Sequence, residues 1–339
     1  MSQATGIAER LAWVAVDWGS SNLRAWALAD DGQVLARAGA ERGMLSLAPD
    51  DYEATLLATI GDWLPADGRV PVRVCGMAGA RQGWREAAYL PVPTRLDDLA
   101  WGVVRPAVED PRLDVALLPG LCQYPDDAGR RFDVMRGEET QLAGLAAREG
   151  EVSGHVCLPG THAKWARLEA GAVTRFATFL TGELYGLLAG QSVLRHSLHH
   201  GPGEDDLAEP GCREAFEAAV QEVATAPEAF STRLFGLRAQ DLLDGGLPTG
   251  QARGARLAAR LSGLVIGLEL AGARAMLTEG ERVTLIGAET LCHRYALALE
   301  VLGIDFRRLD GEAAVLAGLG LAHATLPHDA NTPDTRPEP

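Results

Sequence analysis

Residues 13–30 read WVAVDWGSSNLRAWALAD, and this stretch determines how the rest of the chain is interpreted. An apolar run ends in a Gly-Ser-Ser turn and an alternating segment follows, which predicts a β-hairpin. Residues 155–171, HVCLPGTHAKWARLEAG, repeat this layout of strand, glycine turn, strand and reverse turn. The duplication predicts two similar halves rather than a repeat array.

Strands and helices alternate through both halves, which predicts an α/β fold. Further strands are expected at residues 70–79, 115–120 and 282–289, and helices at 50–63, 137–150, 289–302 and 311–324, with mostly helical sequence at 183–275. We expect a first domain at residues 1–135 and a second at 136–325, whose last helix could pack back on the first. The Pro- and Asp-rich tail, 326–339, is predicted to be disordered.

The composition is that of a globular protein without a polyanionic partner. The chain has 339 residues, 47% of them hydrophobic, and a net charge of −15, which argues against nucleic acid or an anionic membrane as partner. No segment is long enough to span a bilayer, so the predicted location is the cytoplasm. The five cysteines are widely spaced and lack a CxxC pair, which indicates neither a disulfide framework nor a zinc site.

Two residue types are nearly absent from the chain. Lys164 is the only lysine among 31 Lys and Arg residues, and Asn22 is the only asparagine outside the tail. Lysine and arginine are not interchangeable where a compact ammonium must meet a phosphate or a carboxylate. Lys164 is therefore a candidate catalytic or carboxylate-binding group, and the alternative is a solvated lysine on a surface strand.

Both hairpin turns have the composition of an anion-binding site. In the first, Gly19 admits a close backbone approach, Ser20 and Ser21 add donors, and Asp17 could hold Mg²⁺ through water. In the second, Gly160 and Thr161 repeat this pattern ahead of Lys164. The alternative for each is an ordinary tight turn, but two such turns in one chain reinforce the phosphate-binding interpretation.

Residues 135–144, MRGEETQLAG, place Glu138 and Glu139 at the start of a predicted helix. Either carboxylate could act as general base toward a hydroxyl, although acidic residues also favour helix N-termini for electrostatic reasons alone. The sequence leaves the choice between them open.

Three further segments carry weaker signals. Gly287 and Ala288 stand at a strand end where small residues would admit a flat base. Arg81 and Trp84 lie in GMAGARQGW, which suits an anionic, hydroxylated ligand, although core packing explains Trp84 equally well. The histidines at 196, 199 and 200 favour a solvated loop over a metal site. Neither a P-loop nor a GxGxxG dinucleotide motif is present.

The order of these motifs resembles the actin/hexokinase/Hsp70 ATPase superfamily. More closely, DWGSSNLRAW, GMAGARQGW, LPGLC, MRGEETQL, LPGTHAKW and TGEL resemble the 2-dehydro-3-deoxygalactonokinase family, over residues 13–325. The resemblance implies two ribonuclease-H-like (actin/hexokinase-type) domains flanking an ATP cleft. It also implies transfer of the ATP γ-phosphoryl group to the 6-hydroxyl of 2-dehydro-3-deoxy-D-galactonate in galactonate breakdown, with Mg²⁺.

The resemblance further implies roles for individual residues. Phosphate binding falls to Asp17, Gly19, Ser20, Ser21, Gly160 and Thr161, and adenosine binding to Gly287 and Ala288. Glu138 falls where related kinases have a base, usually Asp. The candidates for the substrate carboxylate are Arg24, Arg81, Arg136 and Lys164, with Asn22 and Trp84 as further substrate contacts.

Two other functions remain open at this point. The same fold could phosphorylate another sugar or sugar acid, such as 2-dehydro-3-deoxygluconate, because one inverted hydroxyl changes few contacts. Alternatively, the chain could be a non-kinase switch protein driven by ATP, and fold alone does not decide between these. A homodimer would be consistent with an exposed apolar face on the helices of residues 183–275.

Overall fold

The computed structural model describes residues 3–127, 129–198 and 206–326. The chain forms two compact units. The first comprises Met1–Val152, Glu169–Arg175 and Ala313–Pro339, and the second comprises Ser153–Leu168 and Phe176–Glu312. The predicted domain ranges stay a prediction. The expected disorder of the tail concerns positions that, from 327 on, lie outside the described residues, as do His199 and His200.

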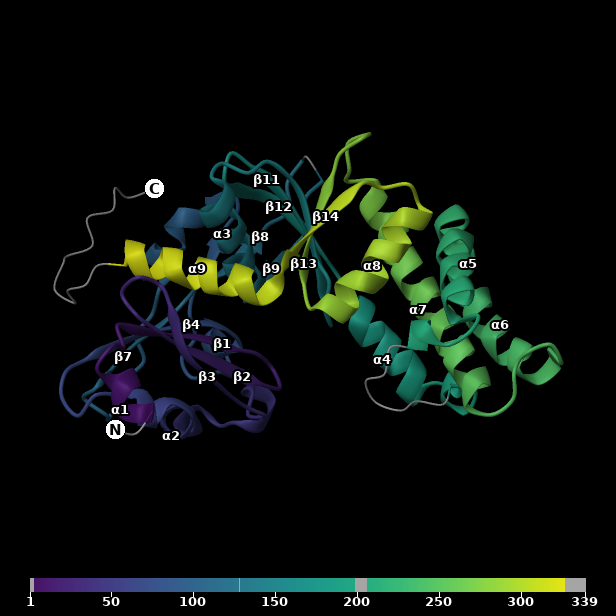
Figure 1. Cartoon of the computed structure of the whole chain (residues 1–339). Helices are drawn as coiled ribbons and strands as arrows, with labels where there is room; N and C mark the ends of the chain where they lie inside the picture. The colour runs from purple at the N-terminus through teal and green to yellow at the C-terminus, as the bar shows by residue number, and fades with distance from the viewer. Residues whose placement is uncertain (1–2, 128, 199–205, 327–339) are drawn as a thin grey trace. The chain divides into compact units, whose positions relative to one another are not determined.

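A five-stranded sheet forms the centre of the first unit (Figure 1). Its strands, in the order β3-β2-β1-β4-β7, are Val34–Ala40, Leu23–Leu28, Trp13–Trp18, Val70–Gly76 and Leu113–Leu117. Strand β2 runs antiparallel to both β1 and β3, whereas β4 pairs parallel with β1 and β7 pairs parallel with β4. The predicted hairpin at residues 13–30 is thereby confirmed.

A six-stranded sheet, whose residues belong mostly to the second unit, repeats this order. Five of its strands, in the order β12-β11-β10-β13-β14, are Ala172–Phe179, Ala163–Glu169, Gly154–Leu158, Val283–Gly287 and Phe306–Asp310. Strand β10 pairs antiparallel with β11 and parallel with β13, which pairs parallel with β14. Strand β1 lies between β2 and β4, and β10 lies in the same way between β11 and β13. This repetition confirms the two similar halves and the α/β fold that the sequence predicts.

The remaining elements surround these sheets. The helices are α1 (Gln3–Ala8), α2 (Tyr52–Ile60), α3 (Glu138–Glu149), α4 (Thr181–Gln191), α5 (Cys212–Thr225), α6 (Phe230–Leu243), α7 (Gln251–Arg274), α8 (Glu289–Val301) and α9 (Gly311–Thr325). Short 3₁₀ turns span Met44–Ser46, Pro49–Asp51, Gly61–Trp63, Met77–Gly79, Leu96–Gly102, Val193–His196, Asp206–Ala208 and Pro227–Ala229. A small sheet joins β5 (Tyr89–Pro91), β8 (Gly120–Gln123) and β9 (Asp133–Met135), and β6 (Thr94–Arg95) pairs with the start of β12. No helix in the described residues is long and apolar enough to cross a membrane.

Strand β1 is buried on both faces, which explains its unbroken apolar sequence. On one face Val14 and Val16 join a core with Leu56 of α2, and on the other Ala15 packs with Leu319 of α9. Each fully buried side chain of this size contributes about 1.5–3 kcal/mol to folding. The end of β1, where Asp17 lies, is therefore held firmly by the core.

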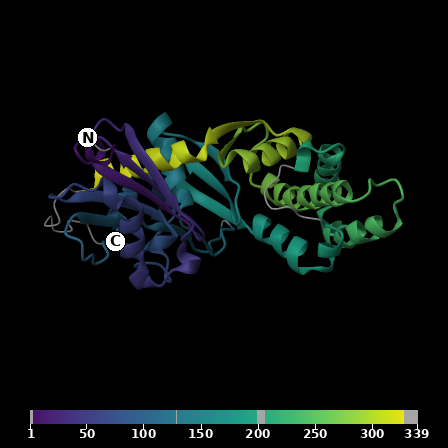
Figure 2. The ribbon, with the colours of Figure 1, turned by 60° about the horizontal axis from the view of Figure 1, so that its bottom comes forward.

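The helices of the second unit pack closely around glycines. In α7, a Cβ atom on Gly263 would lie 2.3 Å from the carbonyl oxygen of Phe216, and one on Gly267 would lie 3.0 Å from Val220 of α5. Figure 2 shows the green helices α5 to α7 lying alongside one another. The close fit holds α7 against β11 and α8 through a shared apolar core.

Helices α3 and α9 cross in the first unit with almost no space between their backbones. A Cβ atom on Gly144 would lie 1.8 Å from the carbonyl oxygen of Ala314, and one on Gly318 would lie 1.9 Å from that of Thr140. Real Cβ atoms do not approach backbone atoms so closely, so both positions require glycine. The crossing fixes the axis of the helix that begins at Glu138.

We predict that Gly318→Ala lowers the free energy of unfolding by about 1–3 kcal/mol, because the backbones must move apart. Gly320→Ala, two residues along the same helix, is the matched control, since nothing lies within 4 Å of its Cβ position. It should be neutral or stabilise by about 0.5–1 kcal/mol, as expected for Gly→Ala within a helix. Urea unfolding of both variants measures the difference, and equal effects would contradict the close crossing.

Candidate functional site

The first hairpin turn is rigid. The Gly19 N–H donates to the carbonyl of Asn22 at 2.8 Å, and the carbonyls of Gly19 and Ser20 accept from Met44 and Leu45 at 3.1 and 2.9 Å. Because these carbonyls and the Gly19 N–H are already paired, the serine residues supply the donors that the turn can present to an anion. This geometry agrees with a phosphate-binding turn.

Asp17 lies just ahead of this turn, in register with Arg24 on the neighbouring strand. Its side chain is 19% exposed, and its carboxylate accepts from Arg24 Nη2 at 2.5 Å. The described residues contain no cluster of three metal-ligating side chains. A single accessible carboxylate nevertheless fits Mg²⁺, which in proteins commonly binds one carboxylate, water and the phosphates of its nucleotide.

Two glycines with positive φ bring the end of β1 and the start of α3 together. A Cβ atom on Gly76 (φ +89°) would lie 2.6 Å from the Trp18 carbonyl oxygen and 3.5 Å from the carboxylate of Asp17. A Cβ atom on Gly137 (φ +105°) would lie 3.4 Å from the Gly76 Cα. The start of α3 therefore lies close to the end of β1, where Asp17 is placed.

Glu139 is fully buried and folds back on its own helix start. Its two carboxylate oxygens accept the Gly137 N–H at 2.9 and 2.7 Å, and one also accepts from the Thr140 hydroxyl at 3.2 Å. Burial, with a smaller contribution from neighbouring Glu138, raises the pKa of Glu139 to about 8. Glu139 thus satisfies a backbone donor that the helix itself leaves unpaired.

Glu138 is half-buried, and its Oε2 accepts the Arg136 N–H at 3.1 Å. The two adjacent glutamates therefore differ in environment: one is enclosed and the other can be approached. This difference bears directly on which of them could act as a base.

Arg136 is held mainly by structural contacts. Its guanidinium stacks 4.2 Å from the Tyr89 ring centroid, and its Nη2 donates to the Ala87 carbonyl at 2.8 Å. Its Nη1 is buried and has no hydrogen-bond partner within the described part of the chain. That Nη1 lies beside Gly79, whose Cβ position is 2.9 Å away, and protein atoms enclose it.

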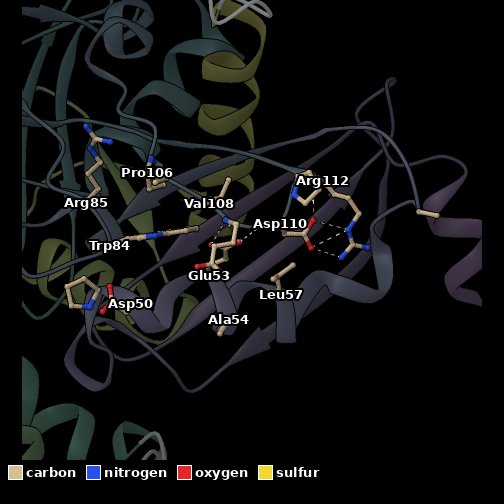
Figure 3. Close-up of a pocket in the computed structure, with 15 residues that line it drawn as sticks. Asp50, Glu53, Ala54, Leu57, Trp84, Arg85, Pro106, Val108, Asp110 and Arg112 are labelled. Carbon is tan, nitrogen blue, oxygen red and sulfur yellow. Dashed lines mark hydrogen bonds and ion pairs between the residues drawn. The ribbon is translucent and has the colours of Figure 1, made fainter.

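The structure gives Arg81 and Trp84 different surroundings. Arg81 is 80% exposed and pairs with Glu86 at 3.3 Å. Trp84 stacks on Tyr52 with ring centroids 5.9 Å apart and lines an open groove with Glu53 (Figure 3). These contacts support the packing explanation for Trp84 more than a contact with substrate.

In the second unit, the start of α4 packs on the second hairpin turn. The Thr161 carbonyl accepts the Glu183 N–H at 3.0 Å. A Cβ atom on Gly182 would lie 2.6 Å from the Gly160 carbonyl oxygen, so only glycine allows this approach. The turn at Gly160 and Thr161 is therefore fixed by the segment TGEL.

A cavity of about 350 Å³ opens beside this turn. Its lining combines apolar side chains with a few polar groups, as is typical of small-molecule sites. The lining residues are Gly160, Thr161, Thr181, Gly182, Tyr185, Ser262, Val265, Ile266, Leu291, Arg294 and Tyr295. Its size and its position next to a phosphate-type turn suit a nucleotide.

Gly287 and Ala288 lie close to this cavity but are not among the residues that line it. Gly287 ends β13, with its Cβ position 3.6 Å from the Pro159 carbonyl oxygen, and Ala288 precedes α8. The wall on this side comes from Leu291 and Arg294, one turn further along. Sequence reasoning missed these residues because the 289–302 helix carries no motif.

Lys164 is 4% exposed and pairs in register with Leu158 on β10. Its Nζ donates to the His162 carbonyl at 3.2 Å. The alternative of a solvated surface lysine is therefore wrong, since a buried ammonium requires a specific role or partner. Nearby, His162 Nε2 and Glu183 Oε2 lie 2.5 Å apart.

The chain belongs to the 2-keto-3-deoxy-galactonokinase family, whose model matches residues 17–322. It is 41% identical over 313 residues to a Rhizobium meliloti (strain 1021) protein named "Probable 2-dehydro-3-deoxygalactonokinase DgoK1", covering 91% of this chain and 96% of that one. It is 35% identical over 313 residues to the Escherichia coli (strain K12) 2-dehydro-3-deoxygalactonokinase, covering 92% and 98%.

A solved structure is similar over the same length. It is the crystal structure of a protein assigned as a 2-dehydro-3-deoxygalactonokinase from Sinorhizobium meliloti, with 39% sequence identity and a TM-score of 0.79, covering 91% of this chain and 97% of that one. The family resemblance, the kinase class and the α/β fold expected from the sequence are thereby confirmed. A kinase family implies the use of ATP.

The raised pKa of Glu139 implies that the free energy of unfolding depends on pH. Because its folded-state pKa of about 8 lies above the ordinary 4.5, the folded protein keeps a proton that the unfolded chain releases. The stability contributed by this proton is present in full below pH 4.5 and is lost as pH rises through 8.

We predict that Glu139→Gln flattens the decline in unfolding free energy between pH 5 and 8, because the amide cannot ionise. Denaturant unfolding of wild type and variant across this range measures the two slopes. Parallel slopes would contradict the buried, protonated state of Glu139.

Proposed function

We propose that the chain transfers the γ-phosphoryl group of ATP to the 6-hydroxyl of 2-dehydro-3-deoxy-D-galactonate. The observation that supports this most directly is that the start of α3 lies against Gly76, next to the first hairpin turn. This contact places a candidate anion-binding turn near Glu138 and Glu139. The transition state of phosphoryl transfer is loose, so positioning and charge neutralisation supply most of the rate. A turn that binds phosphate and a carboxylate that orients the hydroxyl are the groups that this reaction needs.

Glu138 is the proposed base. A general base must be ionised and within hydrogen-bonding reach of the hydroxyl it serves. Glu139, with a pKa of about 8, is mostly protonated at neutral pH and has its carboxylate occupied by the helix start. Glu138 is half-buried and can be approached, so it would orient the hydroxyl and accept its proton late in the transfer.

The nucleotide is proposed to bind in the cavity of the second unit. Its phosphates would meet Gly160 and Thr161, and its base and ribose the walls that include Ser262 and Arg294. Asp17, Ser20 and Ser21 stay predicted phosphate contacts. A bound Mg²⁺ would supply neutralisation of the β- and γ-phosphate charge, with Asp17 as its contact through water.

The remaining proposed contacts concern the sugar acid. Arg24, half-exposed beside Asp17, is the first-unit cation with more support for the carboxylate, and Arg136 has less because its Nη1 is enclosed. Asn22 would hydrogen-bond a hydroxyl. Arg81 and Trp84 have less support as substrate contacts. Location in the cytoplasm and a homodimer stay predictions.

The function is tested by ADP release in a coupled assay with Mg·ATP and each of the two epimeric 2-dehydro-3-deoxy acids, against no acceptor. Turnover with the galactonate epimer is the expected result. Preference for the gluconate epimer would make the proposed substrate wrong, and ADP release without any acceptor would point to a switch ATPase.

We predict that Glu138→Gln lowers kcat by about 10²-fold or more, the usual contribution of a general base. Glu139→Gln is the matched neighbour, and its kcat should stay within about tenfold of wild type because that residue only caps the helix. Steady-state kinetics measure both. The opposite ranking would assign the base to Glu139.

We predict that Lys164→Arg lowers kcat/KM by about tenfold or more, because a planar guanidinium cannot replace a compact buried ammonium. Thermal unfolding of the same preparation shows whether the variant remains folded. A folded variant with wild-type kinetics for both substrates would exclude a catalytic or binding role for this lysine.

A further inference from the structure

Glu269 is a carboxylate enclosed in the second unit. It lies on α7, is 2% exposed, and receives three side-chain hydrogen bonds. Trp165 Nε1 donates to its Oε1 at 2.7 Å, Tyr295 Oη donates to its Oε2 at 2.5 Å, and the Thr181 hydroxyl also donates to Oε2. The three donors come from β11, α8 and α4, so one carboxylate links four elements.

A carboxylate in this position is costly for folding. Burial raises the pKa of Glu269, and its three donors oppose that shift. Buried ionisable groups are often no more stabilising than well-packed apolar side chains of similar volume. Such a group within an otherwise apolar core therefore calls for an explanation other than stability.

Two of the three donors line the cavity that is proposed to bind the nucleotide. Thr181 begins α4, whose next residue packs on the turn at Gly160, and Tyr295 lies on α8 beside Arg294. Glu269 itself is not among the lining residues, so it would act on a ligand only through its partners.

We propose that Glu269 is a positioning residue for the nucleotide site, which fixes α4 and α8 at the two sides of the cavity by holding the hydroxyls of Thr181 and Tyr295. This inference rests on the proposed binding of ATP in that cavity. The hydrogen bond to Thr181 also fixes the start of α4, and hence the second phosphate-type turn. This carboxylate thereby helps to set the relative position of the turn and the cavity walls, together with the packing of Gly182 on Gly160.

The physical reason lies in the directions of the hydrogen bonds. A carboxylate only accepts, so both hydroxyl hydrogens must point at Glu269 and both side chains take one orientation. In Glu269→Gln the amide oxygen can keep the Trp165 donor, but the NH₂ group would face two hydroxyls that must rotate to accept. The side-chain volume is kept, whereas the arrangement of donors is reversed.

The test compares Glu269→Gln with Glu281→Gln in the full chain. Glu281 is the matched control because it is also a low-exposure carboxylate of the second unit. It accepts from the His155 ring and Arg167 at 2.9 and 3.0 Å, and neither partner lines the cavity. Both variants replace a low-exposure, hydrogen-bonded carboxylate by a neutral amide and are expected to lower the melting temperature.

We predict that Glu269→Gln raises the KM for ATP by about tenfold, as expected when hydrogen bonds to a charged group are lost. The KM for the sugar acid should change less than about twofold, because the acceptor contacts proposed above include Glu138, Arg24 and Asn22 but not Glu269. Glu281→Gln should leave both KM values as in wild type. A KM for ATP that is unchanged in folded Glu269→Gln, or raised equally in both variants, would overturn the inference.

A second pair of variants covers the case in which Glu269→Gln fails to fold. Thr181→Val removes one donor at nearly constant shape, and Thr181→Ser keeps it. Thr181→Val should raise the KM for ATP, and Thr181→Ser should restore most of the affinity. Equal KM values in this pair would also overturn the inference.

Wild-type controls separate this inference from the proposed function. Titration calorimetry with the non-hydrolysable analogue AMPPNP shows whether the wild-type chain binds nucleotide. If it does not, the proposed function fails first and the role of Glu269 at a nucleotide site falls with it. If wild type binds and Glu269→Gln binds equally well, only the role of Glu269 is excluded.

Discussion

The close crossing of α3 and α9 is the constraint on which the first unit depends. Glycines at 144 and 318 let the two backbones touch, and this contact fixes the helix that begins with Glu138 and Glu139. Because Gly76 and Gly137 bring that helix start against the end of β1, the position of the carboxylates relative to Asp17 follows from backbone contacts alone. A flexible loop could not hold a base and a phosphate-binding turn with comparable precision.

Each unit places a buried glutamate behind its candidate binding groups. Glu139 accepts the N–H of Gly137 at the start of the helix that carries Glu138. Glu269 accepts the hydroxyls of Tyr295 and Thr181, which line the cavity beside Gly160. In both cases a buried glutamate positions the groups proposed to meet a ligand, which are Glu138 in the first unit and Thr181 and Tyr295 in the second. The ligand need not touch the buried glutamate itself. Such supporting shells set the precision of a site, since a displacement of about 1 Å can lower the rate by two orders of magnitude.

The sequence predicted the fold well because the apolar strands and glycine turns are local signals. It could not predict the α3–α9 crossing, since Gly144 and Gly318 resemble other small helix residues until their neighbours are known. The turn residues of the candidate site were recognisable for the same local reason. Leu291, Arg294 and Tyr295 were not, because they come together only when the helices pack, and the environment that separates Glu138 from Glu139 is likewise tertiary.

The proposed reaction is transfer of a phosphoryl group to one hydroxyl of a sugar acid. The most direct measurement is phosphorus and carbon NMR of the product formed from Mg·ATP and 2-dehydro-3-deoxy-D-galactonate, because it identifies both the bond formed and its position. A single phosphomonoester at carbon 6 is expected, formed only when enzyme and acceptor are both present. Inorganic phosphate as the main product, or a phosphate ester at another position, would contradict it.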